Sequence, residues 1–346
     1  MNFCWRKLPG LRTFAVAMSM LLLLPGQTAS AQSAEKALPV RIGIQAQPSW
    51  LLYTARELKF FEKAGLAPTY IRITTGAQAI AAMASKSIDI ASPGITPFAA
   101  GIAQGVPWKA IAIDATMPGA EGFLARGDTD IKKLEDLKGK TIGVARGSTS
   151  YYGIIAALKS KGIDRSEVKL LSMGPPEQIG AMKHRDVDAV AVWEPWIQRQ
   201  IKDAGARLIG MEADYGVRTA MGVEAVLEDF AENNPETIDR FLKGLLLAYE
   251  HIQKHGPDAA ISAVADAMGV SKDLVEIMYR EAPAPNITRW ADPSYQYSLV
   301  KGGEFHTQAT NMARFMFEEK IIDKEADLSE AFDASFISRL LKGTGK

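Results

Sequence analysis

The chain has 346 residues, with 40 basic and 40 acidic side chains and a single cysteine. The balanced charge argues against a nucleic-acid partner, because no surplus of Lys and Arg is available to neutralise phosphates. A chain of this length exceeds what one hydrophobic core usually serves, so more than one domain is expected.

The first 31 residues have the pattern of a cleaved signal peptide. Arg6, Lys7 and Arg12 precede an apolar stretch over residues 14–25 that is too short to span a bilayer, and Ala29-Ser30-Ala31 fits a signal-peptidase site. Cleavage there starts the mature chain at Gln32 and leaves 37 basic and 40 acidic residues. The single cysteine, Cys4, lies in the removed segment, so disulfide and thiolate chemistry are not expected in the mature protein. The predicted location is the periplasm.

Strand-like and helix-like segments then alternate in two series. The first series predicts strands over 40–45, 69–73 and 88–91 and helices over 51–64 and 77–84. The second predicts strands over 141–145, 168–171 and 187–192 and helices over 150–161 and 176–183. This alternation is typical of βαβ units on parallel sheets, and two series predict two similar lobes.

An internal repeat supports the duplication. In Ala82-Met83 the methionine is followed six residues later by Asp89, and in Ala181-Met182 it is followed six residues later by Asp188. In both copies the pattern ends a helix, makes a turn and begins a strand. Beyond about Phe230 the sequence predicts mostly helices, over 235–254, 258–268, 272–280 and 297–320, with Asn234-Pro235 as the first helix start.

The segment that follows the strand at 141–145 predicts an anion site. Gly147 allows a turn, and Ser148 or Thr149 can cap the next helix. A helix that begins directly after a strand presents unpaired N–H groups and the positive end of its dipole, which small anions bind.

The order of several short motifs resembles the periplasmic substrate-binding proteins of ABC importers for nitrate, taurine and aliphatic sulfonates, a family also grouped with thiamine-precursor binders. The resemblance covers roughly residues 40–341. It rests on the segments Val40-Arg41-Ile42-Gly43, Phe60 to Leu66, Thr75 to Ile80, Ser87 to Ala91, Leu134 to Gly143, Gly147 to Ser150, Val187-Asp188-Ala189, Trp193-Glu194-Pro195 and Asn234-Pro235-Glu236. Lys86 and Arg185 depart from the pattern, since the family usually has glycine at these two turn positions.

The resemblance implies an α/β, two-lobe periplasmic-binding-protein fold (type II-like). Two parallel-sheet lobes would be joined by two crossover strands, near residues 118–123 and 215–222, with a helical C-terminal region. The first lobe is expected to comprise residues 38–120 and 219–346, and the second residues 121–218. A monomer that closes over one ligand and docks on a membrane permease is expected.

Residues at strand ends are the predicted ligand-binding residues, because open α/β sheets bind ligands at the carboxyl ends of their strands. Arg218, near the second crossover, could pair with a sulfonate or carboxylate through its planar guanidinium. The full set is Gln45, Gln47, Ser49, Trp50, Gly94, Thr96, Gly147, Ser148, Thr149, Ser150, Trp193, Glu194 and Arg218.

The predicted ligand is a small organic anion, aliphatic sulfonate or taurine-like, with nitrate and carboxylates left open. A thiamine-precursor pyrimidine or another heteroaromatic is the alternative. An enzyme on the same scaffold is the least favoured hypothesis, because relatives that cleave carbon–sulfur bonds use a cysteine and no Ser-His-Asp pattern occurs. The four histidines lack metal-ligand spacing, so neither a metal nor a cofactor is expected.

Overall fold

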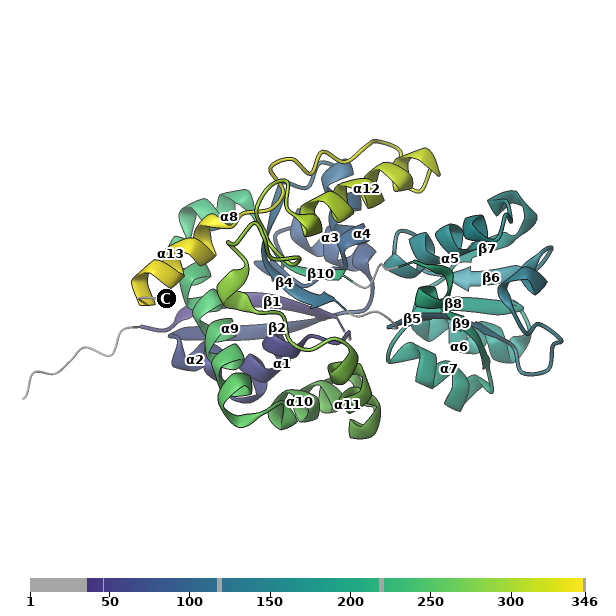
Figure 1. Cartoon of the computed structure of the whole chain (residues 1–346), viewed down its shortest axis with the longest axis horizontal. Coiled ribbons are helices and arrows are strands. Elements are labelled where there is room, and N and C mark those ends of the chain that lie inside the picture. The colour runs from purple at the N-terminus through teal and green to yellow at the C-terminus, as the bar shows by residue number, and fades with distance from the viewer. Residues whose placement is uncertain (1–35, 46, 117–119, 218–220, 345–346) are drawn as a thin grey trace, which may run out of the picture. The chain divides into compact units, whose positions relative to one another are not determined.

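A computed structural model describes residues 36–45, 47–116, 120–217 and 221–344. The predicted signal peptide lies outside these residues. Two five-stranded sheets form the framework (Figure 1). The strands of the first sheet, in spatial order, are β2 (Leu66–Ile73), β1 (Leu38–Gln45), β3 (Ile90–Ala91), β10 (Met221–Leu227) and β4 (Trp108–Thr116). Those of the second are β7 (Lys169–Ser172), β6 (Thr141–Val144), β8 (Ala189–Trp193), β5 (Glu121–Ala125) and β9 (Arg207–Met211).

Both sheets are mixed: the prediction of parallel sheets is confirmed for four strands of each sheet and is wrong for the fifth. β10 pairs antiparallel with β3 and β4, and β5 pairs antiparallel with β8 and β9. The reason is that the chain passes twice between the sheets. After β4 of the first sheet it enters the second sheet as β5, and after β9 of the second sheet it returns to the first as β10. The predicted crossovers include residues 118, 119 and 218–220, which lie outside the described residues.

Helices cover both faces of each sheet (Figure 1). On the first sheet, α1 and α2 pack with α9 and α10, whereas α4 packs with α3 and α12. On the second sheet, α5 lies on one face, and α6 and α7 pack together on the other. The bounds of the helices on the first sheet are α1 (Trp50–Glu57), α2 (Phe60–Lys63), α3 (Gly76–Ala84), α4 (Ile95–Ala103), α8 (Glu228–Asn233), α9 (Pro235–His255), α10 (Asp258–Met268), α11 (Lys272–Glu281), α12 (Glu304–Glu318) and α13 (Ser335–Thr344). Those on the second sheet are α5 (Thr149–Ser160), α6 (Pro175–His184) and α7 (Trp196–Ala204).

Two helix predictions needed correction. The single helix expected over 51–64 is divided, because Lys59 adopts a left-handed conformation with φ of 54° between α1 and α2. The helix expected from residue 297 begins only at Glu304, because Gly302 has a φ of 80° and Gly303 is the N-cap of α12.

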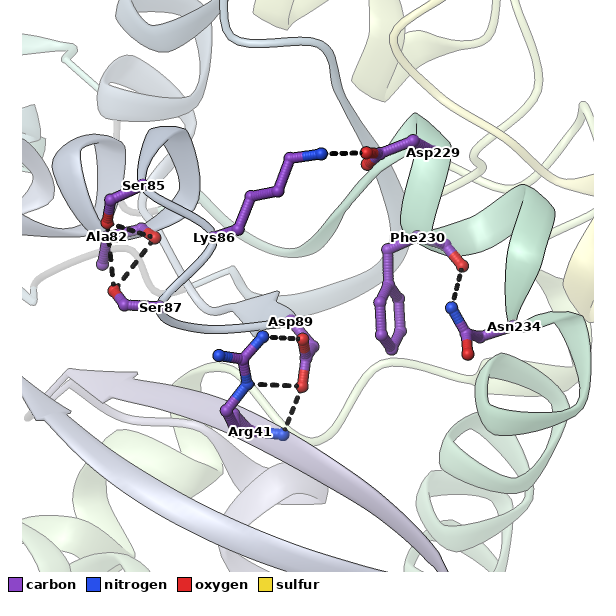
Figure 2. Close-up of polar contacts among 9 residues, drawn as sticks. All are labelled: Arg41, Ala82, Ser85, Lys86, Ser87, Asp89, Asp229, Phe230 and Asn234. Carbon is purple, nitrogen blue, oxygen red and sulfur yellow. Dashed lines mark hydrogen bonds and ion pairs between the residues drawn. The ribbon is translucent and has the colours of Figure 1, made fainter.

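The structure confirms the internal repeat at the level of individual hydrogen bonds. The backbone N–H of Asp89 donates to the carbonyl oxygen of Arg41 (2.8 Å), and the Asp89 carboxylate accepts from the Arg41 N–H (2.7 Å) and guanidinium (Figure 2). Asp188 repeats the two backbone contacts with Thr141, at 2.8 and 2.9 Å. The carboxylates therefore join the start of the third strand of each series to the start of the first.

The turns before these aspartates contain left-handed residues that are not glycine, Lys86 and Arg185. The φ values are 55° for Lys86 and 65° for Arg185. This conformation costs a non-glycine residue roughly 1–2 kcal/mol. The Lys86 ammonium contacts the Asp229 carboxylate (Figure 2), but both side chains are well exposed, so the ion pair offsets little of that cost.

Lys86→Gly is therefore expected to raise the free energy of unfolding by about 0.5–1 kcal/mol, the relief of strain exceeding the extra chain entropy of glycine. Urea denaturation measures the change. Lys183→Gly, at an exposed position in the last turn of α6, is the control and should lower the stability, by at most about 1 kcal/mol. Equal destabilisation by both substitutions would contradict the role of the left-handed turn.

Candidate functional site

A polar pocket lies where strands of both sheets end. Gln45 ends β1, Gly94 follows β3, Ser148 follows β6, and Trp193 ends β8. The antiparallel strands β5 and β10 begin at this same edge, and so they contribute Glu121 and Met221. The remaining described lining residues are Gln47, Pro48, Gly76, Pro97, Ala120, Thr149 and Gly222. This position is the one at which open α/β sheets bind ligands.

The pocket is small. Its cavity volume is about 50 Å³. This is room for a few waters or for a ligand of few non-hydrogen atoms. A Cβ on Gly94 would lie 3.1 Å from the Thr149 methyl group, so the segments that follow β3 and β6 approach each other closely here. Glycine at position 94 keeps this part of the pocket open.

Amides of the first sheet supply polar groups to the pocket. The side-chain carbonyl oxygen of Gln45 is buried and has no hydrogen-bond partner among the described residues. The Gln47 amide nitrogen donates to the Ser92 carbonyl oxygen (3.2 Å) and to the Asp114 carboxylate (3.0 Å). A buried acceptor without a partner is costly, so a ligand donor facing Gln45 would be stabilising.

The second sheet supplies the N-terminus of α5. Ser148 is the N-cap, and its hydroxyl oxygen accepts from the Tyr151 N–H at 3.1 Å. Ser148 and Thr149 both line the pocket. The predicted capping role of Ser148 is confirmed, and its hydroxyl proton is still available to donate to a ligand oxygen.

Glu121 is the only ionisable side chain among the described residues that line the pocket. It is 4% exposed, and the Ser150 hydroxyl donates to its Oε2 atom. Burial raises the pKa of Glu121 to about 7, and hydrogen bonds from Ser150 and Thr149 act in the opposite direction. Burial therefore favours the protonated form of Glu121, and the two hydroxyls favour its ionised form.

Two further acids are buried behind Gln47. The Asp114 carboxylate accepts from the Ser49 hydroxyl, and the Glu224 carboxylate accepts from the Ser92 hydroxyl at 2.5 Å. Burial raises the pKa of Asp114 to about 6. Burial and the neighbouring Asp114 raise the pKa of Glu224 well above its usual value. This network fixes the amide of Gln47 at the pocket wall.

The structure brings six of the predicted residues together in the pocket. They are Gln45, Gln47, Gly94, Ser148, Thr149 and Trp193. The hydroxyls of Ser49 and Ser150 instead donate to Asp114 and Glu121, so these serines support the acids.

The other predicted residues lie elsewhere. Trp50 is in the core, where its indole N–H donates to the Ala282 carbonyl oxygen (2.9 Å), because the first residue of α1 faces the helices behind the sheet. Thr96 is buried in the first turn of α4 and is not among the lining residues. Gly147 lines a second pocket of about 840 Å³ together with Arg146. Glu194 accepts from the Gln198 backbone N–H and amide, and Arg218 lies outside the described residues.

Sequence reasoning missed the three buried acids. It considered segments that follow parallel strands, whereas Glu121 begins an antiparallel strand and Asp114 and Glu224 lie within strands. A signal was present for Asp114 and Glu224, because each interrupts an otherwise apolar strand, in Ala-Ile-Asp-Ala-Thr and Gly-Val-Glu-Ala-Val. An acid buried in this way indicates a functional or hydrogen-bonded position.

No helix in the described ranges is long and apolar enough to cross a membrane. The same ranges contain no group of three or more His, Cys, Asp or Glu side chains that could hold a metal ion.

Two α/β sheets with equivalent strand orders and a shared polar pocket at their strand ends define a periplasmic-binding-protein fold. The chain belongs to the NMT1/THI5-like family, whose model matches residues 49–260. A Bacillus subtilis (strain 168) protein named "Putative aliphatic sulfonates-binding protein" is 28% identical over 337 residues, which are 94% of this chain and 96% of that protein. The taurine-binding periplasmic protein of Escherichia coli (strain K12) is 29% identical over 191 residues, 55% of this chain and 59% of that protein.

Solved structures show the same fold. The alkanesulfonate-binding protein of Xanthomonas axonopodis pv. citri, bound to MOPS, matches with a TM-score of 0.71 at 20% identity, over 86% of this chain and 98% of that one. A desulfurization enzyme also matches, with a TM-score of 0.62 at 17% identity, over 89% of this chain and 99% of that one. The fold alone therefore does not separate binding proteins from enzymes.

Proposed function

We propose that this protein is the periplasmic solute-binding component of an ABC importer and binds a small aliphatic sulfonate or a related organic acid. The observation that carries the proposal is the polar pocket at the strand ends, with the capped N-terminus of α5 among its walls. Peptide N–H groups at a helix start and the Ser148 hydroxyl suit sulfonate oxygens. The relatives named for sulfonates and taurine support the same ligand class.

A binding role is favoured over catalysis. The single cysteine, Cys4, precedes the predicted cleavage site, so a cysteine nucleophile is not expected in the pocket. A heteroaromatic ligand is less favoured than a sulfonate, because Trp193 is the only aromatic side chain among the described lining residues and the volume is small. Nitrate and carboxylates remain compatible with the same donors.

A ligand panel read by thermal unfolding tests the proposal. An aliphatic sulfonate present at a hundred times its dissociation constant should stabilise the protein by about 2.7 kcal/mol. The panel includes nitrate, short carboxylates and a thiamine-precursor pyrimidine. Stabilisation by the pyrimidine alone would contradict the sulfonate class and favour a heteroaromatic ligand. Turnover of a stabilising sulfonate would favour an enzyme.

We infer that the exported protein begins at or near Gln32 and carries no lipid, because the predicted signal peptide ends at Ala31 and no cysteine follows it. Intact mass and N-terminal sequencing of the periplasmic fraction check this. A membrane-bound product that keeps residues 14–25 would contradict it.

We also infer that residues 38–120 with 219–346 form one lobe and residues 121–218 the other, in a monomer that docks on its permease. The assignment of each sheet to one of these ranges supports the division. Closure around a ligand should reduce the radius of gyration in solution scattering. An unchanged radius at saturating ligand would contradict closure.

A further inference from the structure

We propose that an anionic ligand binds in the pocket at the strand ends together with one proton, which the Glu121 carboxylate takes up from solvent. The inference rests on the proposed function and makes the affinity rise as the pH falls. It starts from the pocket wall, where Glu121 is the one ionisable side chain among the described lining residues. An anion beside an ionised Glu121 would bring two negative charges together, and this favours the protonated carboxyl.

Glu121 competes with the ligand for the N-terminus of α5. The Ser150 hydroxyl donates to its Oε2 atom, and the Thr149 hydroxyl is also hydrogen-bonded to it. Both hydroxyls belong to the first turn of α5, where the acid group of the ligand is proposed to bind. An ionised Glu121 therefore places a negative charge at this helix start before any ligand arrives. Protonation removes that charge, and the carboxyl O–H can donate to a ligand oxygen.

The acids around Glu121 do not hold it in the ionised form. Glu194 follows β8, and its backbone N–H donates to the carbonyl oxygen of Ala120 (2.8 Å). Glu212 begins the short 3-10 helix η3 (Glu212–Tyr215) and is buried against Gly153 of α5, where a Cβ would lie 1.5 Å from its Oε1 atom. Neither acid supplies a positive charge, and no Lys, Arg or His of the described ranges forms an ion pair with Glu121.

The cations on the elements that pack against β5 are directed elsewhere. Arg207 of β9 lies opposite Ala125, the last residue of β5, and donates to two backbone carbonyl oxygens. Lys159, in the last turn of α5, forms an ion pair with Glu319 of α12. The other ionisable side chains on these elements are exposed charged residues or tyrosines, namely Arg199, Lys202 and Asp203 of α7, Asp214 of η3, and Tyr151, Tyr152 and Tyr215.

Titration calorimetry with 1-propanesulfonate at pH 6, 7 and 8 tests the inference, because this compound has no group that titrates in that range. Burial raises the pKa of Glu121 to about 7, so the Kd of the parent protein should rise about tenfold from pH 6 to pH 8. Repeating the titrations in buffers of different ionisation enthalpy measures the protons taken up. About half a proton per ligand is expected at pH 7, and nearly one at pH 8.

Two variants assign the proton to Glu121. The assignment needs them because Asp114 and Glu224, buried behind Gln47, also have raised pKa values. Glu121→Gln, which is neutral at every pH and can still donate, should bind 1-propanesulfonate with nearly the same affinity at pH 6 and pH 8. Glu57→Gln removes an exposed acid outside the pocket and should keep the pH dependence of the parent.

The outcomes separate this inference from the proposed function. Equal affinity of the parent at pH 6 and pH 8, or tighter binding at pH 8, would overturn the proton uptake and leave sulfonate binding intact. A pH dependence in Glu121→Gln as steep as in the parent would overturn the role of Glu121. Failure of the parent to bind at any of the three pH values would overturn the proposed sulfonate class and this inference with it. Thermal unfolding at each pH establishes that the variants are folded.

Discussion

The free energy of unfolding is expected to fall by about 3 kcal/mol between pH 5 and pH 8 in the absence of ligand. Glu121 and Asp114 have pKa values of about 7 and about 6 in the folded protein, above their usual values, because both are buried. The folded protein therefore holds protons that the unfolded chain has already released, so its stability falls as the pH rises toward the folded-state pKa values. Each unit of this range is worth about 1.4 kcal/mol per group. His251, whose pKa is lowered by burial, offsets a part of the loss.

Denaturant unfolding at several pH values measures this effect. The exposed Asp292 has a pKa of about 2, so its contribution to the free energy of unfolding changes only below pH 5. Glu121→Gln and Asp114→Asn each remove one of the titrating groups and should flatten the dependence, and the double variant should flatten it further. The buried Glu224, whose pKa is also raised, keeps a part of it. A stability that rises between pH 5 and pH 8 in the parent protein would contradict the burial of neutral acids beside the pocket.

Replacing Ser148 and Thr149 together with alanine is expected to weaken ligand binding by ten- to a hundredfold for each hydrogen bond that is lost. Both residues line the pocket, the Thr149 hydroxyl donates to Glu121, and the substitutions leave the backbone donors of α5 in place. The loss of the Ser148 cap should cost the fold only about 1 kcal/mol. Calorimetry with the ligand from the panel measures the affinity, and thermal unfolding measures the stability.

Ser271→Ala is the matched control for the double variant. Ser271 caps α11 through the Leu274 N–H, outside the pocket, so its loss should lower the stability by a similar amount and leave the affinity unchanged. If the Ser148 and Thr149 variant binds as tightly as the parent, the acid group of the ligand lies elsewhere, and Arg218 becomes the residue to test.

The sequence predicted the elements of the fold better than their pairing. Alternating periodicity located most strands and helices to within a few residues, as for the helix at 258–268. The exchange of β5 and β10 between the sheets could not be predicted from periodicity, because an apolar strand has the same pattern whether its neighbours are parallel or antiparallel. The break between α1 and α2 at Lys59 could not be predicted either. A glycine at this left-handed position would have indicated it, but a lysine does not.

The candidate site was predicted by position in the chain and not by side-chain direction. Gln45 and Ser148 line the pocket because strand ends meet there. Trp50 lies within the same predicted segment as Gln45, but the first turn of α1 directs its ring into the core. Ser150 is two residues beyond Ser148, and its hydroxyl is directed to Glu121. Such directions depend on the start of each helix, which periodicity locates only to within one or two residues.

The central claim is that the ligand binds in the pocket at the strand ends. A crystal structure of the protein with a bound aliphatic sulfonate tests this claim most directly. The sulfonate oxygens are expected within hydrogen-bond distance of the Ser148 hydroxyl, at the start of α5. Ligand density in the larger pocket beside Arg146 and Gly147, or on the outer surface, would contradict the assignment of the strand-end pocket as the binding site.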